Sequence, residues 1–163
     1  DPQGFLREWN KSTKIITQKN ILDIDIYGIT GIKTDQAELS AFTNGVLSLE
    51  GMKFLKKKFN LEFVILTNLN QVMLLHKDIL YSVSLKKFEN SDFVGLGDIL
   101  TTGFSCSYIK EQDPLWALCF GVGAVISSLM SGNKGLEKVP KKMSSIEKNA
   151  SYLYNTVKFR IVD

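Results

Sequence analysis

Apolar residues follow two different periods along the chain, and each period predicts one kind of secondary structure. Apolar and β-branched runs of strand length predict strands, whereas apolar residues that recur every three or four positions predict helices with one buried face. The predicted strands are residues 26–35, 61–69, 71–77 and 79–85. The predicted helices are residues 36–42, 48–59, a segment that ends near Ile109, 114–131, and 144–157 with Ser144 or Ser145 as N-cap. This mixed order predicts a three-layer α/β/α fold.

The most apolar segment, residues 114–133, contains no charged residue. Its length reaches the ~20 residues of a membrane-spanning helix. However, glycines and serines dilute it, and Leu118, Val122 and Val125 recur at steps of three and four, as on one face of a packed helix. The pattern therefore favours a buried core helix, and a single membrane span is the alternative.

The composition is that of a globular domain and excludes several classes of function. The chain has 163 residues, of which 44% are hydrophobic and 23% charged, and this suits a single domain over residues 1–163. A net charge of +3 is too small to indicate a nucleic-acid partner. Cys106 and Cys119 have no metal-binding spacing, so we expect two small buried apolar groups in a reducing compartment, the cytoplasm. The chain begins DPQGFLREW without an initiator methionine, so we expect it to be a fragment of a longer protein.

A short stretch, Gly-Leu-Gly-Asp at residues 95–98, directly precedes a helical pattern. A helix N-terminus exposes unpaired N–H groups and the positive end of the helix dipole, and glycines let an anion approach the backbone closely. Gly95 and Gly97 therefore suit an anion hole at which the Leu96, Gly97 and Asp98 amides are aimed. Asp98 can there accept the proton of a hydroxyl that attacks a bound phosphoryl group. The alternative is structural: the glycines form a turn and Asp98 is the N-cap of the helix.

The same stretch belongs to a longer segment with a family resemblance. Residues 92–104 (DFVGLGDILTTGF) resemble the C-terminal signature D-T-T-G-A-G-D-x-F-x-x-G-F of the ribokinase-like, PfkB-type carbohydrate kinases. The matching residues are Asp92, Gly95, Gly97, Asp98, Gly103 and Phe104. Residues 32–38, 64–75 and 113–140 resemble neighbouring segments of that family in the same order. The resemblance implies a ribokinase-like fold, of which this chain is the C-terminal portion, because the sugar-binding motifs of the N-terminal half have no counterpart here.

The resemblance implies a catalytic centre around residues 92–98. Asp98 would be the general base for the acceptor hydroxyl, and Gly95, Leu96 and Gly97 would form the anion hole for charge on the phosphoryl group. Asp92 stands where relatives with a monovalent cation site have a ligand. These assignments imply an ATP-dependent phosphotransferase whose acceptor is a sugar or a polyol.

The resemblance also implies a nucleotide site and a magnesium site. The implied nucleotide-binding residues are Asp35, Thr67, Asn68, Gly97 and Val122. Val122 stands where many relatives have Asn or His near the adenine. Glu38, supported by Asp35, would hold Mg²⁺ and its waters, a role that suits carboxylate oxygens. The alternative for these two carboxylates is capping of the predicted helix 36–42.

Some positions depart from the family pattern and keep a second hypothesis open. Leu69 and Val72 replace two glycines that follow Thr67 in the family. The second hypothesis is a non-catalytic nucleotide-binding or interaction module derived from such a kinase. In either case we expect a small-molecule partner, no nucleic acid and no membrane, and pairing either with a second copy or with a missing N-terminal half.

Overall fold

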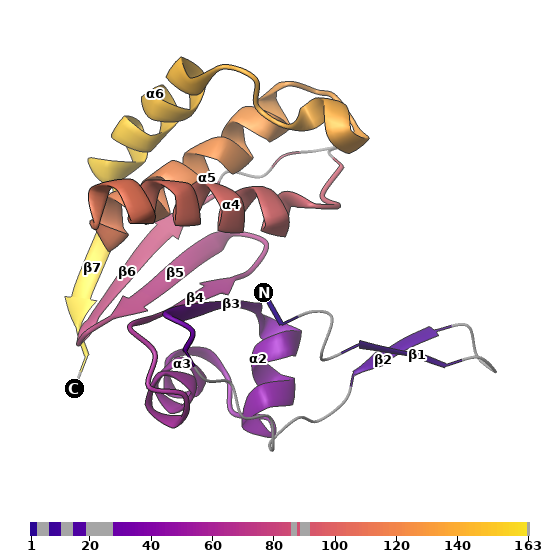
Figure 1. The fold of residues 1–163 in the computed structure, drawn as a ribbon, viewed down its shortest axis with the longest axis vertical. Helices are drawn as coiled ribbons and strands as arrows, with labels where there is room; N and C mark the ends of the chain where they lie inside the picture. The colour runs from indigo at the N-terminus through magenta and orange to yellow at the C-terminus, as the bar shows by residue number, and fades with distance from the viewer. Residues whose placement is uncertain (3–6, 11–14, 19–27, 86–87, 89–91, 163) are drawn as a thin grey trace. The chain divides into compact units, whose positions relative to one another are not determined.

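The computed structural model describes residues 1–2, 7–10, 15–18, 28–85, 88 and 92–162 (Figure 1). Within these residues the main sheet has five strands in the order β3-β4-β5-β6-β7, and a separate antiparallel sheet pairs β1 (Arg7–Asn10) with β2 (Ile15–Gln18). The chain divides into two compact units, which are described in turn. The first unit is Asp1–Leu69, Met73–Leu80 and Ile161–Asp163, and the second is Asn70–Val72 and Tyr81–Arg160.

The first unit is built on two parallel strands joined by two helices. β3 (Gly31–Asp35) and β4 (Phe63–Thr67) pair in parallel with Asp35 opposite Thr67. Parallel strands need a crossover connection, which here consists of α2 (Gln36–Thr43) and α3 (Ser48–Lys58). The parallel pairing places the carboxyl ends of both strands at one edge of the sheet.

A hydrophobic cluster packs the first unit. Met52 and Leu55 from α3 are fully buried, whereas the lysines in the last turn of that helix lie favourably near the negative end of its dipole. The other buried members of the cluster are Ile32, Leu39, Phe42, Leu61, Val64, Leu66, Leu75, Leu80 and Val162. The continuous apolar run of β4 supplies two of them, as expected for a strand covered on both faces.

The remaining strands of the main sheet are short. β5 (Gln71–His76) and β6 (Ile79–Ser84) are joined by a two-residue turn in which Lys77 has a φ of 51°. β7 (Lys158–Ile161) follows β6 at the edge of the sheet. A two-residue connection of this kind joins antiparallel neighbours.

The second unit consists mainly of three helices, with α5 packed against both α4 and α6 (Figure 1). They are α4 (Leu96–Glu111), α5 (Pro114–Met130) and α6 (Met143–Tyr154), and a short 3₁₀ helix, η1 (Gly135–Lys138), precedes α6. The Asp113 carboxylate caps α5, and proline occupies its first turn.

Two glycines let α5 lie close to its neighbours. A Cβ added at Gly121 would lie 2.8 Å from the Leu100 carbonyl oxygen of α4. A Cβ added at Gly123 would lie 2.8 Å from the Ile146 carbonyl oxygen of α6. Both contacts are with backbone, which cannot move aside easily. The prediction of a buried core helix is confirmed, and within the described part of the chain no helix is long and apolar enough to cross a membrane.

Three local predictions differ from the structure. The strand predicted at 26–35 is formed only over Gly31–Asp35, and Gly28, with a φ of 74°, lies in the bend before it, while residues 26–27 lie outside the described residues. α6 begins at Met143 without a side-chain cap, so the prediction of Ser144 or Ser145 as N-cap is wrong. Cys106 is exposed on α4 and not buried as predicted, whereas Cys119 is buried, which raises the pKa of its thiol to about 12.

Candidate active site

The turn before α4 is built around Gly95 in the left-handed conformation. Gly95 has a φ of 77° and occupies the N-cap position, and no side chain caps this helix. The first bond within the helix runs from the Ile99 N–H to the Gly95 carbonyl at 3.1 Å. The amides of residues 95–98 therefore precede the helical ladder, as the first four N–H groups of a helix always do. α4 thus begins two residues before Asp98, and the alternative that Asp98 is its N-cap is wrong.

Asp98 lies in the first turn of α4 and is exposed to solvent. Its carboxylate is close to the turn: a Cβ added at Gly95 would lie 3.8 Å from Asp98 Oδ2. Of the three amides predicted to face an anion, that of Leu96 donates to the Phe93 carbonyl at 3.3 Å and so belongs to the turn itself. The amides of Gly97 and Asp98, with that of Gly95, are the better candidates for an anion hole.

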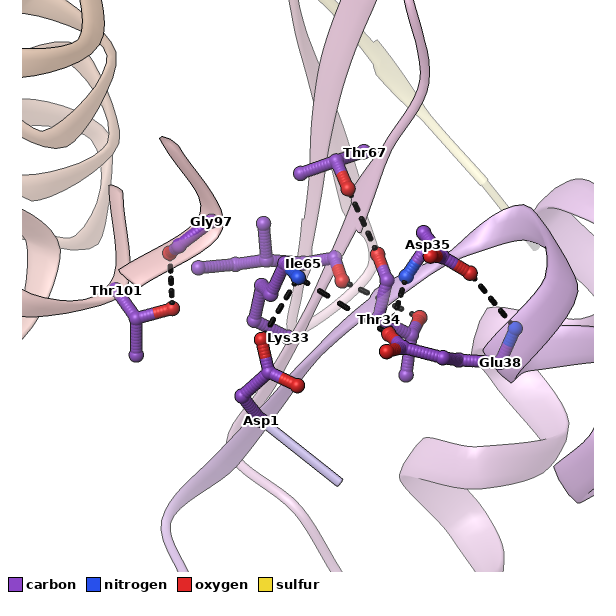
Figure 2. A network of polar contacts seen from close by, with 9 residues as sticks. All are labelled: Asp1, Lys33, Thr34, Asp35, Glu38, Ile65, Thr67, Gly97 and Thr101. Atoms are coloured by element: carbon purple, nitrogen blue, oxygen red, sulfur yellow. Dashed lines mark hydrogen bonds and ion pairs between the residues drawn. The ribbon is translucent and has the colours of Figure 1, made fainter. Parts of the chain in front are cut away.

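Gly97, the second glycine of residues 95–98, accepts a hydrogen bond from within α4. The Thr101 hydroxyl donates to the Gly97 carbonyl at 2.8 Å (Figure 2). Gly103 and Phe104, the last two residues that match the family signature, have packing roles. A Cβ added at Gly103 would lie 3.1 Å from the Gly121 Cα, and Phe104 is buried.

Asp92 is bound to the loop after α5. Its carboxylate accepts hydrogen bonds from the Gly135 N–H at 3.1 Å and the Val94 N–H at 3.0 Å, and it forms an ion pair of 3.0 Å with Lys138 Nζ. The hydrogen bond from Gly135, the Lys138 ammonium and the hydrogen bond from Val94 lower the pKa of Asp92 from 3.8 to about 2. The carboxylate is therefore ionised at neutral pH.

In the first unit, Asp35 and Glu38 form a capping box at the start of α2 (Figure 2). The Glu38 N–H donates to Asp35 Oδ1, and the Asp35 N–H donates to Glu38 Oε2, both at 2.8 Å. Glu38 is 1% exposed, and Lys33 Nζ lies 4.0 Å from its Oε2. The alternative prediction, that these two carboxylates cap the helix, is therefore confirmed.

The same cluster was predicted to hold Mg²⁺. Mg²⁺ keeps several waters and takes one or two carboxylates with the phosphates of its substrate. Glu38 is buried and already balanced by Lys33, which also forms an ion pair of 2.8 Å with Asp1. Over the described ranges no three His, Cys, Asp or Glu residues gather as a metal site. Direct ligation of Mg²⁺ by Glu38 therefore does not fit, and only Asp35 is exposed enough to meet a hydrated ion.

The predicted nucleotide-binding residues do not share one environment. Thr67 ends β4 and donates to the Thr34 carbonyl at 3.2 Å, so it lies with Asp35 at the carboxyl edge of the parallel pair (Figure 2). Asn68 follows it and is exposed. Val122 is fully buried in α5, so its side chain is not accessible to a nucleotide. Gly97 belongs to the second unit, whereas Asp35, Thr67 and Asn68 belong to the first.

Two lysines in these clusters, Lys33 and Lys138, were not predicted from the sequence as site residues. Lys33 is 9% exposed and Lys138 is 4% exposed, which is unusual for this residue type. The available signal for Lys138 was its place near the end of residues 113–140, a segment that resembles the family. Lys33 gave a weaker signal, its place in a predicted strand that ends at Asp35.

Comparison with known proteins places this fold. No protein-family model matches the sequence, and no curated protein matches it. Among solved structures, a pyrophosphate-dependent myo-inositol-1 kinase converted by mutation into a myo-inositol-3 kinase has a TM-score of 0.69, at 18% identity over 94% of this chain and 53% of that chain. Phosphofructokinase-2 from Escherichia coli, in complex with potassium, has a TM-score of 0.65 at 18% identity over 78% of this chain and 42% of that one. Ribokinase from Thermotoga maritima has a TM-score of 0.64 at 17% identity, with coverage of 76% and 42%.

These similarities bear on the fold. The predicted resemblance to ribokinase-like kinases is confirmed at the level of the fold, and so is the predicted α/β class. The sheet that carries it has five strands. The chain spans about half the length of the first of these structures, consistent with the predicted C-terminal portion.

Proposed function

We propose that this chain is the phosphate-handling part of a kinase that transfers a phosphoryl group to a hydroxyl of a sugar or polyol. The observation that carries the proposal is the start of α4, where Gly95 in the left-handed conformation leaves first-turn amides open beside the exposed carboxylate of Asp98. The fold likeness to inositol, fructose-phosphate and ribose kinases supports it. This chain covers 53%, 42% and 42% of those three kinases, so the activity is proposed for a protein that contains this chain.

In the proposed reaction, Asp98 is the catalytic base. Its carboxylate accepts the proton of the acceptor hydroxyl while that oxygen forms a bond to phosphorus and the bond between phosphorus and the donor's bridging oxygen breaks. The amides of Gly95, Gly97 and Asp98 donate to the oxygens of the transferring phosphoryl group, on which charge is spread in the transition state. Such amides are fixed in direction by the helix, so no reorganisation is needed when the reaction occurs.

The proposed donor is ATP, bound along the carboxyl edge of β3 and β4, where open α/β sheets bind their ligands. Thr67 and Asn68 are the proposed contacts, with Asp35 facing a hydrated Mg²⁺. When bound, Mg²⁺ supplies charge neutralisation for the donor phosphates. Pyrophosphate is the second donor to test, because several kinases of similar structure are described as pyrophosphate-dependent.

The test is Asp98→Asn in the full-length protein, assayed with ATP–Mg²⁺ and with pyrophosphate against a panel of sugars and polyols. Removing a general base lowers kcat roughly 10²–10⁴-fold, and we expect donor affinity to change little. Glu111→Gln, at the exposed far end of α4, is the matched control and is expected to keep wild-type turnover. Unchanged kcat in Asp98→Asn would rule out the assigned role.

A second candidate function is a non-catalytic nucleotide-binding or interaction module. Leu69, which replaces a glycine of the family pattern, is 85% exposed, and Val94 beside the proposed anion hole is 82% exposed. Both side chains are apolar where the family pattern has a glycine or a threonine, and this departure motivates the second candidate. Titration of ATP–Mg²⁺ separates the two functions: binding without turnover of any acceptor supports the module.

A further inference from the structure

The ammonium group of Lys138 lies in a cradle of three oxygen atoms on the segment before α4. Nζ donates to the Asp92 carbonyl at 3.0 Å, to the Val94 carbonyl, and to the Asp92 carboxylate at 3.0 Å. A lysine ammonium has three N–H donors, so these contacts use all of them. Because the side chain is only 4% exposed, the charge is balanced by protein oxygens and hardly by water.

Backbone carbonyls with a nearby carboxylate are also what a large monovalent cation such as K⁺ prefers as ligands. The sequence analysis placed such an ion at Asp92. A second positive charge at the same oxygens would be repelled by the ammonium at close range. The oxygens present therefore do not fit an additional cation while Lys138 occupies them.

We propose that Lys138 is a built-in cation, whose ammonium group takes the place of a monovalent metal ion at Asp92 and Val94. Both segments involved lie in the second unit, so the arrangement is independent of the first. η1 and the loop around it are anchored through Lys138 and Gly135 to Asp92. The direct consequence is that order in residues 92–95 does not depend on K⁺.

The cradle also acts on the proposed anion hole, and this step rests on the proposed function. The Val94 carbonyl and the Gly95 N–H belong to one trans peptide group, so they point in opposite directions. Lys138, by holding that carbonyl, fixes the direction of the Gly95 N–H. Donation to the carbonyl also polarises the peptide and strengthens its N–H as a donor. Lys138 is thus a positioning residue for Gly95.

The first test measures thermal unfolding of wild type and Lys138→Ala in equal concentrations of tetramethylammonium, Li⁺, K⁺ or NH₄⁺ chloride. Wild type is expected to show the same Tm in all four salts. Lys138→Ala is expected to lose about 5–10 °C in tetramethylammonium, because carbonyls and a carboxylate lose their partner. K⁺ or NH₄⁺ at ten times its Kd should restore about 3–5 °C, whereas tetramethylammonium is too large to enter. Lys138 also lines a groove of about 480 Å³, which gives the ion a path from solvent.

Two further variants keep this test decisive. Lys141→Ala, an exposed lysine of the same groove, is the matched control and is expected to behave as wild type. Lys138→Met keeps the aliphatic stem without the charge, so it should lose stability but regain less with K⁺, since its side chain still fills part of the space. If Lys138→Ala does not fold in any of the four salts, the Tm values of Lys138→Met decide whether the proposal holds. A selective response of wild type to K⁺, or no selective response in either Lys138 variant, would overturn the proposal.

The second test is turnover in the same salts. Wild-type kinase activity is expected to be equal in K⁺ and tetramethylammonium, and Lys138→Ala is expected to be active only with K⁺ or NH₄⁺. A wild type that transfers no phosphate under any condition counts against the proposed function. It leaves the built-in cation to be decided by the Tm measurements alone.

Discussion

α2 and α4 both carry a carboxylate as the third residue of the first turn, as α3 does at Glu50, and α2 and α4 use it differently. In α2 this residue is Glu38, which is buried and closes a capping box with Asp35. In α4 it is Asp98, which is exposed, and no side chain caps that helix. The N-cap residue makes the difference: Asp35 offers a carboxylate to the Glu38 amide, whereas Gly95 has no side chain to offer.

This difference separates structural carboxylates from available ones. The Glu38 carboxylate accepts a hydrogen bond from the Asp35 N–H and lies 4.0 Å from Lys33 Nζ, so it is already paired within the protein. The left-handed turn at Gly95 leaves first-turn amides without a side-chain cap, beside the exposed carboxylate of Asp98. A helix start that is not capped by a side chain keeps backbone amides that can bind an anion.

The largest expected effect on stability is that of Glu38→Ala, compared with Asp98→Ala at the same helix position. Glu38→Ala removes half of the capping box and leaves the buried Lys33 less well balanced, so we expect a loss of roughly 2–4 kcal/mol. Asp98→Ala should change the free energy of unfolding by about 0.5 kcal/mol or less, as for most exposed sites. Urea unfolding of both variants measures this. Equal losses would mean that Asp98 is also a structural residue.

The next largest effect on stability is expected at Gly95, in the turn before α4. Gly95→Ala places a side chain at a φ of 77°, which costs roughly 1–2 kcal/mol. Its Cβ would meet nothing closer than 3.8 Å, so the cost comes from the backbone conformation. Gly132→Ala is the matched control, because Gly132 has a φ of 68° with open space around it. Both variants should lose similar stability in urea, but only Gly95→Ala should lose turnover. Loss of turnover in both would detach the activity from the α4 turn.

The sequence predicted the fold class and most elements because their signals are local. β4 is a continuous apolar run and α5 has one regular apolar face, so both were predicted with nearly correct limits. The start of α6 was misplaced because Lys142 caps it without a side-chain bond. Cys106 was misjudged because the apolar run around it lies on a helix that is exposed along one side.

The candidate site was predicted less completely, because much of it depends on contacts distant in sequence. Gly95 and Asp98 could be read from neighbouring residues. The pairing of Lys138 with Asp92 spans 46 residues and leaves no periodic trace. The capping box of Asp35 and Glu38 was foreseen as an alternative, but the choice between capping and metal binding needed the burial of Glu38 and the position of Lys33.

The smallest expected effect is a change in stability at low pH, where the Asp92 carboxylate becomes protonated. Asp92 anchors the segment that leads into α4 from outside the helix, whereas Asp35 caps α2 directly. Because hydrogen bonds from Gly135 and Val94 and the Lys138 ammonium lower the pKa of Asp92 to about 2, the ionised form stabilises the native state. That contribution is fully present above the usual pKa of 3.8 and is lost as the pH falls through about 2.

The Tm difference between wild type and Asp92→Asn should therefore be constant from pH 7 to pH 5 and should shrink below about pH 4. Glu147→Gln, an exposed carboxylate on α6, serves as the control and should follow wild type at every pH. A difference that persists unchanged to pH 2 would mean that Asp92 acts through hydrogen bonds that asparagine does not reproduce, and not through its charge. In that case the segment before α4 would depend on Asp92 as a hydrogen-bond acceptor, and not on its negative charge.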